Sequence, residues 1–354
     1  MVKPQNGLPD GWRMPAEWET HYATWIAWPH QRDDWPGKFG PIPWVFAEIV
    51  RHVVRSERVG LLVHDAAIER NARRRLRLAG VDLGRIDFTS CPTDRGWMRD
   101  SAGVFVKDAA GSLTLLDWGF NAWAKYDNWT LDDQTPQAIA THLNLPRRAP
   151  LFNGRRVVLE GGAIDVNGAG LLLTTEECLL SDVQQRNPGM TRQDYELVFA
   201  EQLGVRKVLW LGRGLAGDDT HGHVDDLARF VGPRTVVLVQ EDDPGDKNYE
   251  PLRENAERLR AMTDLDGRPL EIVPLPMPAP LLFRGQRLPA SYANFYIAND
   301  CVLVPTFNDP NDRRALNTLA ELFPGRAVVG IHAVDLVWGL GTLHCLTQQQ
   351  PAAP

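Results

Sequence analysis

The chain has 354 residues, of which 44% are hydrophobic and 23% are charged, as is ordinary for a soluble globular protein. Its 38 lysines and arginines and 45 aspartates and glutamates give a net charge of −7. No basic stretch is long enough to follow a phosphate backbone, and no apolar run approaches the roughly 20 residues that cross a bilayer, so neither nucleic acid nor a membrane is an expected partner.

The N-terminal stretch and the cysteines give no sign of a secreted or disulfide-rich protein. The N-terminal stretch lacks the apolar segment of a signal peptide. Cys91, Cys178, Cys301 and Cys345 are scattered without the spacing of a zinc site or a disulfide framework. We therefore expect a cytoplasmic protein.

Hydrophobic periodicity and turn residues predict an α/β pattern along the chain. In chain order we expect a strand at 24–29, a helix at 41–57, a strand at 59–64, a helix at 67–79, hairpins at 103–118 and 161–175, a helix at 191–203, a strand at 207–211, a hairpin at 227–240, a helix at 248–264, a hairpin at 294–307, a helix at 310–322 and strands at 327–332 and 343–348. The helix expected at 310–322 has typical start and stop signals. Asp309 and Asn311 flank a proline at its start, and Pro324 follows its end.

The unit of hairpin, helix and further strand recurs at intervals of roughly 55–65 residues, which indicates a repeat architecture. The fifth unit has to be split, with 24–29 pairing with 343–348. A chain that closes on its own terminus in this way makes a ring of units without a free sheet edge. We therefore expect a single α/β catalytic domain over 1–354, with a disordered tail at 349–354.

In such a ring, the residues that enter each hairpin lie at one end of the axis and converge there. The entry points are 97–100, 159–162, 220–226, 290–294 and 339–345. They supply three carboxylates, an imidazole and a thiol, which are Asp100, Glu160, Asp225, His223 and Cys345.

Cys345 raises the question of which histidine serves as its base. If 343–348 is a strand, successive side chains point to opposite faces, and the neighbouring His344 is structural. His221, His223 and Asp225 would share one face of a strand, and imidazole acts as acid or base near neutral pH. The alternatives are a metallohydrolase that binds zinc or iron through the same three residues, and a purely structural role for both histidines.

Carboxylates around a thiol raise its pKa, whereas a nucleophile has to be a thiolate. The arrangement makes chemical sense for a cationic substrate, because carboxylates grip a guanidinium through forked hydrogen bonds and the bound charge favours the thiolate. This predicts hydrolysis of a guanidine through a covalent intermediate, with release of ammonia. The alternative is that the three carboxylates cap turns or pair with arginines such as Arg99 and Arg229.

Specific motifs are spread along nearly the whole chain. They are "PAEWE" (15–19), "TWIAWP" (24–29), "WMRD" (97–100), "DWGFNAW" (117–123), "EGG" (160–162), "GHVDDLARF" (222–230), "SYANFYIAND" (291–300), "VPTFNDPND" (304–312) and "LHCLTQQQP" (343–351). Together they resemble the agmatine deiminase and bacterial (Porphyromonas-type) peptidylarginine deiminase family, within the guanidine-modifying enzymes.

The resemblance implies a five-bladed αβ-propeller (pentein) with pseudo-fivefold symmetry. It also implies that Cys345 is the nucleophile, that His223 is the general acid and base, and that Asp100 and Asp225 bind the guanidinium. Glu160 matches a further acidic residue of the family near the guanidinium and the histidine. No cofactor and no metal are expected, and the products from agmatine would be ammonia and N-carbamoylputrescine.

Two stretches depart from the family's motifs. In "GLGTLHC" (339–345), Leu340 and Thr342 replace a glycine and an asparagine, and "SAG" (101–103) replaces Thr-Gly-Pro. Both lie beside the expected pocket, so they bear on the substrate more than on the reaction. We also expect Trp97, Trp123 and Arg99 among the substrate contacts.

The expected partner is a small-molecule guanidine, and agmatine is preferred over free arginine and peptidyl-arginine. Arginine needs a cation for its α-carboxylate, and the sequence singles none out. A non-catalytic binder of guanidines or polyamines is a further alternative, which the intact Cys345 and His223 disfavour. The sequence leaves open whether the chain forms a homodimer, and whether the loop predicted at 30–43 is a lid or a structural turn.

Overall fold

The computed structural model describes residues 7–353 of the chain. Its strands form five sheets of three or four strands and two short hairpins. In order across each sheet, the strands are β4 (Val104–Lys107), β5 (Leu113–Leu116) and β6 (Arg147–Arg148); β9 (Asp165–Val166), β10 (Leu171–Thr175) and β11 (Lys207–Leu211); β12 (Ala228–Phe230), β13 (Thr235–Gln240) and β14 (Glu271–Pro276); β17 (Tyr296–Ile297), β18 (Cys301–Thr306) and β19 (Ala327–His332); and β20 (Gln348–Pro351), β1 (His21–Ala27), β2 (Arg58–Val63) and β3 (Ile86–Ser90). The two hairpins are β7 (Leu151–Phe152) with β8 (Arg155–Arg156), and β15 (Leu282–Phe283) with β16 (Gln286–Arg287).

All five sheets repeat one strand order. The first strand of each is antiparallel to the second, and the second is parallel to the third. The four predicted hairpins are therefore confirmed, as are the strands that were expected to follow the helices. Central strands such as β13 and β18 are almost continuously apolar and buried, as expected for strands covered on both faces.

The two ends of the chain meet in one sheet, as predicted, but with a different strand. β1 pairs with β20 in antiparallel register, with Trp25 opposite Gln348 and Thr24 opposite Gln349. The expected strand at 343–348 is wrong, because 343–346 forms a helical turn and the strand begins at Gln348. The expected disordered tail at 349–354 is also wrong for its first three residues, because the side chain of Gln350 accepts a hydrogen bond from the Trp25 indole (2.9 Å) and residues 348–351 are buried.

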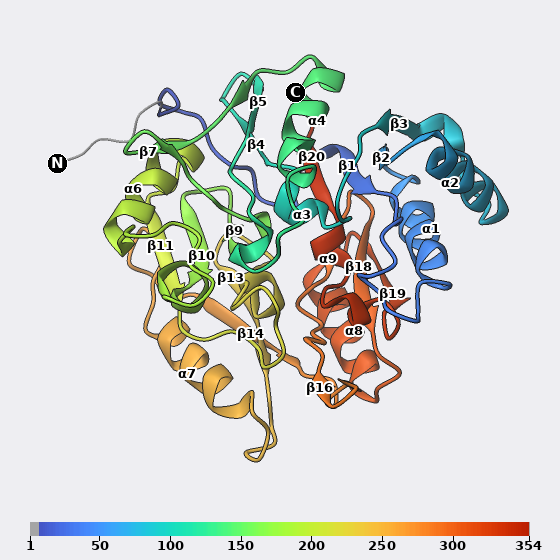
Figure 1. The fold of residues 1–354 in the computed structure, drawn as a ribbon. Coiled ribbons are helices and arrows are strands. Elements are labelled where there is room, and N and C mark those ends of the chain that lie inside the picture. The colour runs from blue at the N-terminus through green and yellow to red at the C-terminus, as the bar shows by residue number, and fades with distance from the viewer. Residues whose placement is uncertain (1–6, 354) are drawn as a thin grey trace.

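The longer helices lie around the outside of the molecule, and the short turns α3 and α9 lie near its middle (Figure 1). The helices are α1 (Ile42–Val53), α2 (Ala66–Leu78), α3 (Met98–Ser101), α4 (Thr135–Leu143), α5 (Glu176–Leu180), α6 (Arg192–Leu203), α7 (Tyr249–Arg260), α8 (Asn311–Leu322) and α9 (Leu343–Leu346). The five predicted helices are confirmed as α1, α2, α6, α7 and α8. α4, β3, β6 and β14 were not predicted.

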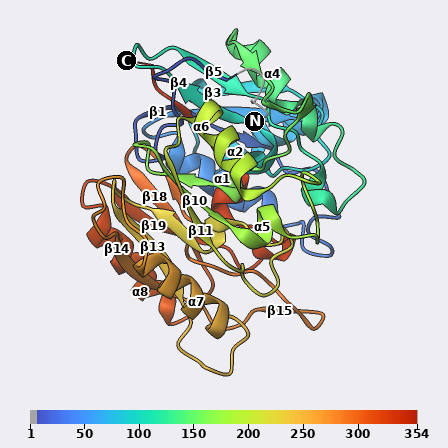
Figure 2. The same ribbon diagram turned by 90° about the vertical axis from the view of Figure 1, so that its left-hand side faces the viewer.

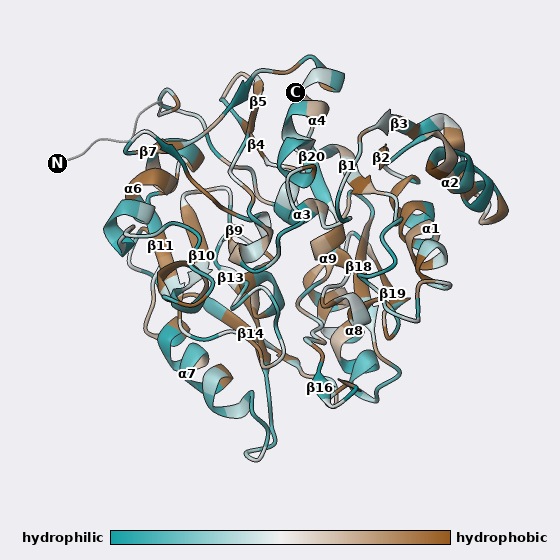
Figure 3. Ribbon diagram, viewed as in Figure 1, coloured by the Kyte–Doolittle hydropathy of each residue, from teal (hydrophilic) through white to brown (hydrophobic). Residues whose placement is uncertain are grey.

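Helix α2 shows why these segments form where they do. Asp65 caps its first turn by accepting hydrogen bonds from the backbone N–H groups of Ala67 and Ile68 (2.7 and 2.8 Å). Ala72 and Leu76, one turn apart, are buried, while the arginines of the helix lie on its solvent-facing side. Figure 3 shows the same division through the molecule, with hydrophobic strands and hydrophilic outer helix faces. Among residues 7–353, no helix is both long and apolar enough to span a bilayer.

A short helical turn precedes the first strand of four sheets. These turns are α3, η4 (Gly161–Ala163), η5 (Val224–Asp226) and α9, and they carry or adjoin the expected site residues. The remaining 3-10 turns are η1 (Leu83–Arg85), η2 (Ala122–Ala124), η3 (Asp132–Gln134) and η6 (Val337–Gly339). The β15–β16 hairpin projects from the body (Figure 2), and its Phe283 ring lies against Trp338 of η6.

Candidate active site

A cavity of about 360 Å³ opens where the helical turns converge. Trp97, Asp100, Trp123 and Cys345 line it, so four of the residues expected from the sequence face one space. His223, Asp225 and Glu160 are fully buried next to this wall. The entry points of separate units thus converge, as the ring of units predicts.

Cys345 lies in the turn α9 and is held by a neighbouring amide. The Asn294 side chain donates a hydrogen bond from Nδ2 to the Cys345 Sγ (3.1 Å). Its oxygen accepts hydrogen bonds from the Thr342 hydroxyl (2.7 Å) and the His344 backbone N–H (3.0 Å), which fixes the turn. Burial and the surrounding carboxylates, Asp225 first, raise the pKa of the Cys345 thiol well above its ordinary value.

The sequence-based argument about His344 fails because α9 is a helical turn and the strand that was assumed there is absent. The His344 ring bridges two buried carboxylates, with Nδ1 2.7 Å from Asp225 Oδ2 and Nε2 2.8 Å from Glu17 Oε2. Arg229 in turn donates to the same Glu17 oxygen (2.8 Å). Burial by itself raises the pKa of Asp225, but the hydrogen bond and charge of His344 outweigh it and hold that pKa below its ordinary value.

His223 points toward the carboxylates of the site without a hydrogen bond to either. Its Nδ1 lies 3.9 Å from Asp100 Oδ1 and 4.0 Å from Asp225 Oδ1, and within residues 7–353 neither ring nitrogen has a hydrogen-bond partner. The ring packs closely over Gly162, where a Cβ atom would lie only 2.5 Å from Nδ1.

His221 does not join this group. Residues 221–223 form a loop and Asp225 lies in the 3-10 turn η5, whereas a shared face of the three side chains required a strand. His221 has a positive φ of 64°, and its Nε2 lies 3.1 Å from the Ser181 hydroxyl. The metal site expected from His221, His223 and Asp225 as the alternative is therefore not assembled.

Asp100 lines the same cavity as Cys345, and its carboxylate is held by two hydrogen bonds. Its Oδ2 accepts a hydrogen bond from the Trp123 indole N–H (3.0 Å), and its Oδ1 accepts one from the Gly162 backbone N–H (3.1 Å). Burial, together with the negative charges of Asp225 and Glu160, raises the pKa of Asp100 to about 6. Trp123 thus faces the cavity and also fixes the carboxylate.

Glu160 is held from behind by an arginine that the sequence analysis did not single out. Arg186 donates from Nε to Glu160 Oε1 (2.9 Å), and both side chains are inaccessible to solvent. The other Arg186 nitrogens donate to the carbonyls of Gln184 and Thr220 (2.9 and 2.5 Å), which ties Glu160 to the loop before His223.

Arg99 does not line the cavity, and this corrects the expectation that it contacts the substrate. It is buried behind α3, where it donates to the Gln349 side chain (2.7 Å) and lies 3.4 Å from Glu17. Because Arg99 precedes Asp100 on a helical turn, the two side chains leave the turn in different directions. Arg99 therefore joins the turn α3 to strand β20.

The outer part of the cavity is acidic. Asp33 and Asp34, from the predicted loop at 30–43, line it together with Asp219. Arg95 carries the only positive charge among the lining residues of the described chain, and it donates to Asp34 (2.7 Å) and Asn128 (2.9 Å). Burial raises the pKa of Asp34 to about 7, although Arg95 opposes this.

Several residues of this site had no role in the sequence analysis. Asn294 and Glu17 lie within motifs, and Asp219 directly precedes the entry segment 220–226, but the sequence does not say which of the polar residues there face inward. Two residues that depart from the family's motifs also contribute directly. Thr342 anchors Asn294, and Leu340 lines the cavity with a positive φ of 69°.

The arrangement suits a planar cation and a covalent reaction. The inner cavity presents buried carboxylates and a thiol that are held in place by hydrogen bonds from the protein. A guanidinium matches such carboxylates through paired N–H donors.

Comparison with known proteins agrees with this chemistry. The chain is 37% identical over 366 aligned residues to the agmatine deiminase of Pseudomonas aeruginosa (strain LESB58), covering 97% of this chain and 96% of that one. Its structure is similar to that of an agmatine deiminase of Enterococcus faecalis (TM-score 0.89, 32% identity, 99% of each chain). It is also similar to that of an agmatine deiminase of C. jejuni, a cysteine-to-serine variant with substrate bound (TM-score 0.85, 28% identity, 99% of each chain). The model of the family described as Porphyromonas-type peptidyl-arginine deiminase matches residues 13–351, and the chain belongs to that family.

Proposed function

We propose that the protein hydrolyses agmatine to N-carbamoylputrescine and ammonia, with Cys345 as the nucleophile and His223 as the general acid and base. One observation carries this proposal. A thiol, an imidazole and the carboxylates of Asp100 and Asp225 adjoin one end of a single cavity. The agmatine deiminases to which the chain is similar agree with the reaction class, a hydrolysis of a guanidine C–N bond.

The first half-reaction forms a covalent bond to sulfur. Asp100 and Asp225 bind the guanidinium, and its positive charge offsets the carboxylates that keep the Cys345 thiol protonated. The thiol loses its proton to solvent, and the resulting thiolate attacks the guanidinium carbon, so that a C–S bond forms. His223 then donates a proton to one terminal nitrogen as the C–N bond breaks, and ammonia leaves behind an S-alkylthiouronium.

The second half-reaction uses the same groups in reverse. His223, now neutral, accepts a proton from a water molecule that attacks the thiouronium carbon. The C–O bond forms, the C–S bond breaks, and the ureido product and the thiol are released. Glu160, fixed by Arg186, stabilises the protonated imidazole and the bound cation by its negative charge.

The acidic mouth of the cavity favours agmatine over arginine. Agmatine carries an ammonium at its far end, which Asp33, Asp34 and Asp219 attract. The α-carboxylate of arginine would meet these carboxylates instead, and Arg95 is already paired with Asp34 and Asn128.

The repeated strand order supports the finer description of the fold as a five-bladed αβ-propeller with pseudo-fivefold symmetry. Each of the five sheets would be one blade, and the blade that joins β20 to β1 would close the ring. The whole chain would then act as one catalytic domain, because residues from all the blades meet at the axis.

The test is ammonia release from agmatine, arginine and a blocked peptidyl-arginine, with Cys345→Ser measured alongside. The proposal expects agmatine to be turned over with the highest kcat/KM, and the variant to lose more than about 10³-fold in kcat. Full activity of Cys345→Ser would refute the thiol mechanism. A preference for arginine would refute the assignment of the substrate and leave the reaction class standing.

A further inference from the structure

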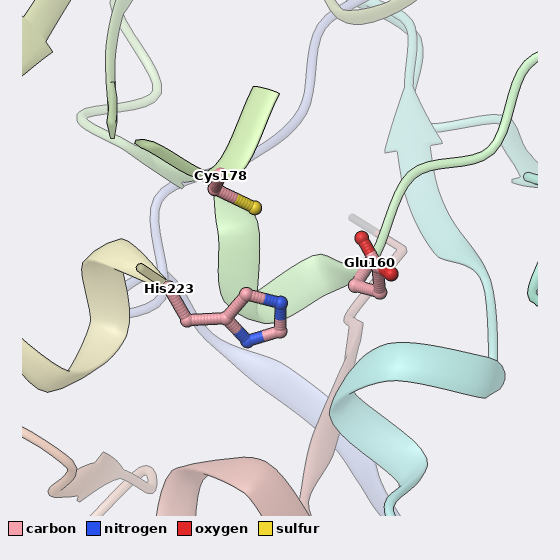
Figure 4. Close-up of side chains that lie close together, drawn as sticks. All are labelled: Glu160, Cys178 and His223. Carbon is pink, nitrogen blue, oxygen red and sulfur yellow. The ribbon is translucent and has the colours of Figure 1, made fainter. Parts of the chain in front are cut away.

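Three side chains with metal-binding atoms meet beside the cavity, and the hydrolysis uses only two of them. They are Glu160, Cys178 and His223, and one ligand atom from each lies within 4.8 Å of the others. Figure 4 shows them directed into one space from three different elements. Cys178 comes from α5, Glu160 precedes η4, and His223 precedes η5.

Two of these residues have unsatisfied polar atoms. Within residues 7–353, neither Glu160 Oε2 nor either ring nitrogen of His223 has a hydrogen-bond partner, and all three atoms are buried. A buried polar atom without a partner destabilises the folded protein, so such atoms call for a ligand. Arg186 binds only Oε1 of Glu160, which leaves Oε2 available.

The thiol is held in place by its own local structure. The Thr175 hydroxyl accepts a hydrogen bond from the Cys178 backbone N–H (3.1 Å) and donates one to the carbonyl of Gly222 (2.6 Å). The close approach needs a glycine, because a Cβ atom at Gly222 would lie 3.0 Å from Glu177 and its φ is +98°. One hydroxyl therefore fixes Cys178 and the residue before His223 against each other.

We propose that Glu160, Cys178 and His223 form a zinc site that inhibits the enzyme when it is occupied. A thiolate, an imidazole and a carboxylate are the three kinds of ligand that zinc uses in proteins. Tetrahedral zinc with bonds of about 2.0–2.3 Å needs ligand atoms about 3.3–3.8 Å apart, so small side-chain movements close the site. A water molecule would fill the fourth position.

Zinc binding changes the charges of the site. The thiol loses its proton to solvent as the S–Zn bond forms, and the thiolate and the Glu160 carboxylate then face both the divalent cation and the Arg186 guanidinium that is paired with Glu160. Burial raises the pKa of the Cys178 thiol, and the metal replaces the proton that burial would otherwise retain. Asp100, 3.9 Å from His223, adds a further negative charge near the ion.

The inhibition, unlike the binding, rests on the proposed function. A zinc-bound His223 nitrogen has no free lone pair with which to accept a proton from water. Glu160 would also be drawn from its position beside the substrate cation. Zinc at this site therefore stops turnover without touching the Cys345 sulfur.

Cobalt(II) tests the binding directly, because thiolate coordination gives a near-ultraviolet charge-transfer band. The metal-free enzyme and its Cys345→Ser variant are titrated with Co²⁺, and both are expected to develop the band with one ion per chain. Cys178→Ser is expected to lose it. Cys301→Ala is the matched control, since Cys301 is also buried but lies in β18, and it is expected to keep the band. Loss of the band in Cys345→Ser, its survival in Cys178→Ser, or no band in the wild type would overturn the proposal.

The second measurement is the Zn²⁺ concentration that halves agmatine turnover, relative to the same protein in chelator. Cys178→Ser should need more than about tenfold more zinc than the wild type, since even outer partners of a metal site are worth about 10–100-fold in affinity. Equal sensitivity of the two proteins would mean that zinc acts at Cys345, and would overturn the inhibition. If no protein releases ammonia but the cobalt band behaves as expected, the proposed function fails and the metal site stands.

Discussion

The carboxylates at the inner end of the cavity and those at its mouth differ in their ion-pair partners. At the inner end, Asp100 and Asp225 make no ion pair with a lysine or arginine of residues 7–353, and their partners are an indole, a backbone N–H and His344. At the mouth, Asp34 is paired with Arg95, and Asp219 with Lys125 and the Tyr126 hydroxyl. At the inner end Asp100 thus has no lysine or arginine partner and Asp225 is paired only with His344, whereas two of the three aspartates at the mouth are already paired with a lysine or an arginine.

This difference explains how a carboxylate-rich pocket can hold a thiol nucleophile. Without substrate, burial and the neighbouring carboxylates raise the pKa of the Cys345 thiol, so it stays protonated. In the proposed mechanism the guanidinium supplies a positive charge beside Cys345, so the thiolate forms only when the substrate is bound. The aspartates at the mouth do not affect the thiol. We expect them to affect only the affinity for the ammonium group of the substrate.

The largest expected effect follows from neutralising an inner carboxylate. Asp225→Asn removes a buried negative charge that pairs with His344 and is expected to bind the substrate cation. Breaking a buried charged pair costs about 3–5 kcal/mol. We expect kcat/KM for agmatine to fall by more than about 10²-fold. Thermal unfolding of the same variant separates loss of fold from loss of function. Activity within a few-fold of the wild type would remove the distinction between the two ends.

The pH dependence of kcat/KM sharpens the same point. Asp100 has a pKa of about 6 in the free enzyme, so below that pH it is protonated, neutral and unable to attract a guanidinium. We expect kcat/KM for agmatine to fall by about tenfold per pH unit below pH 6 and to level off above it. Asp100→Asn should be weakly active and lack this dependence. A flat wild-type profile between pH 5 and 7 would show that Asp100 need not be ionised.

Substitution of His344, which contacts Asp225, is expected to lower activity less than substitution of Asp225 itself. His344→Gln keeps a hydrogen-bonding side chain but loses the bridge from Asp225 to Glu17, so Asp225 is less firmly ionised and oriented. We expect kcat to fall by about 10–100-fold, the range found when partners of a ligand-orienting histidine or carboxylate are removed.

A matched histidine variant is available as the control. Within residues 7–353 the His221 ring has one hydrogen bond, to the Ser181 hydroxyl, which is not among the residues that line the cavity, and His221→Gln should therefore change kcat less than threefold. Equal losses in the two variants would point to general destabilisation, and the role of His344 as a positioning residue would be abandoned.

His344 also shows where sequence reasoning stops. Hairpins and outer helices follow from local periodicity, and the convergence of Asp100, His223 and Cys345 follows from the repetition of units. The direction of His344 does not, because a four-residue turn and a short strand have similar apolar patterns. Asn294 fixes that turn from the loop before β17, and Glu17 reaches His344 from 327 residues away in sequence. Such contacts depend on how the sheets assemble, which no local pattern records.

The smallest expected effect is at the mouth and depends on the substrate. Asp219 is partly neutralised by Lys125 and Tyr126, and exposed ion pairs contribute about 0.2–1 kcal/mol. Asp219→Asn should therefore raise the KM for agmatine by only about two- to fivefold, since about 1.4 kcal/mol corresponds to tenfold. Butylguanidine, which lacks the ammonium but keeps the guanidinium and chain length, should show no change in KM. An equal change for both compounds would mean that Asp219 shapes the cavity as a whole, and the ammonium of agmatine would then have to be recognised by Asp33 and Asp34, which also line the cavity.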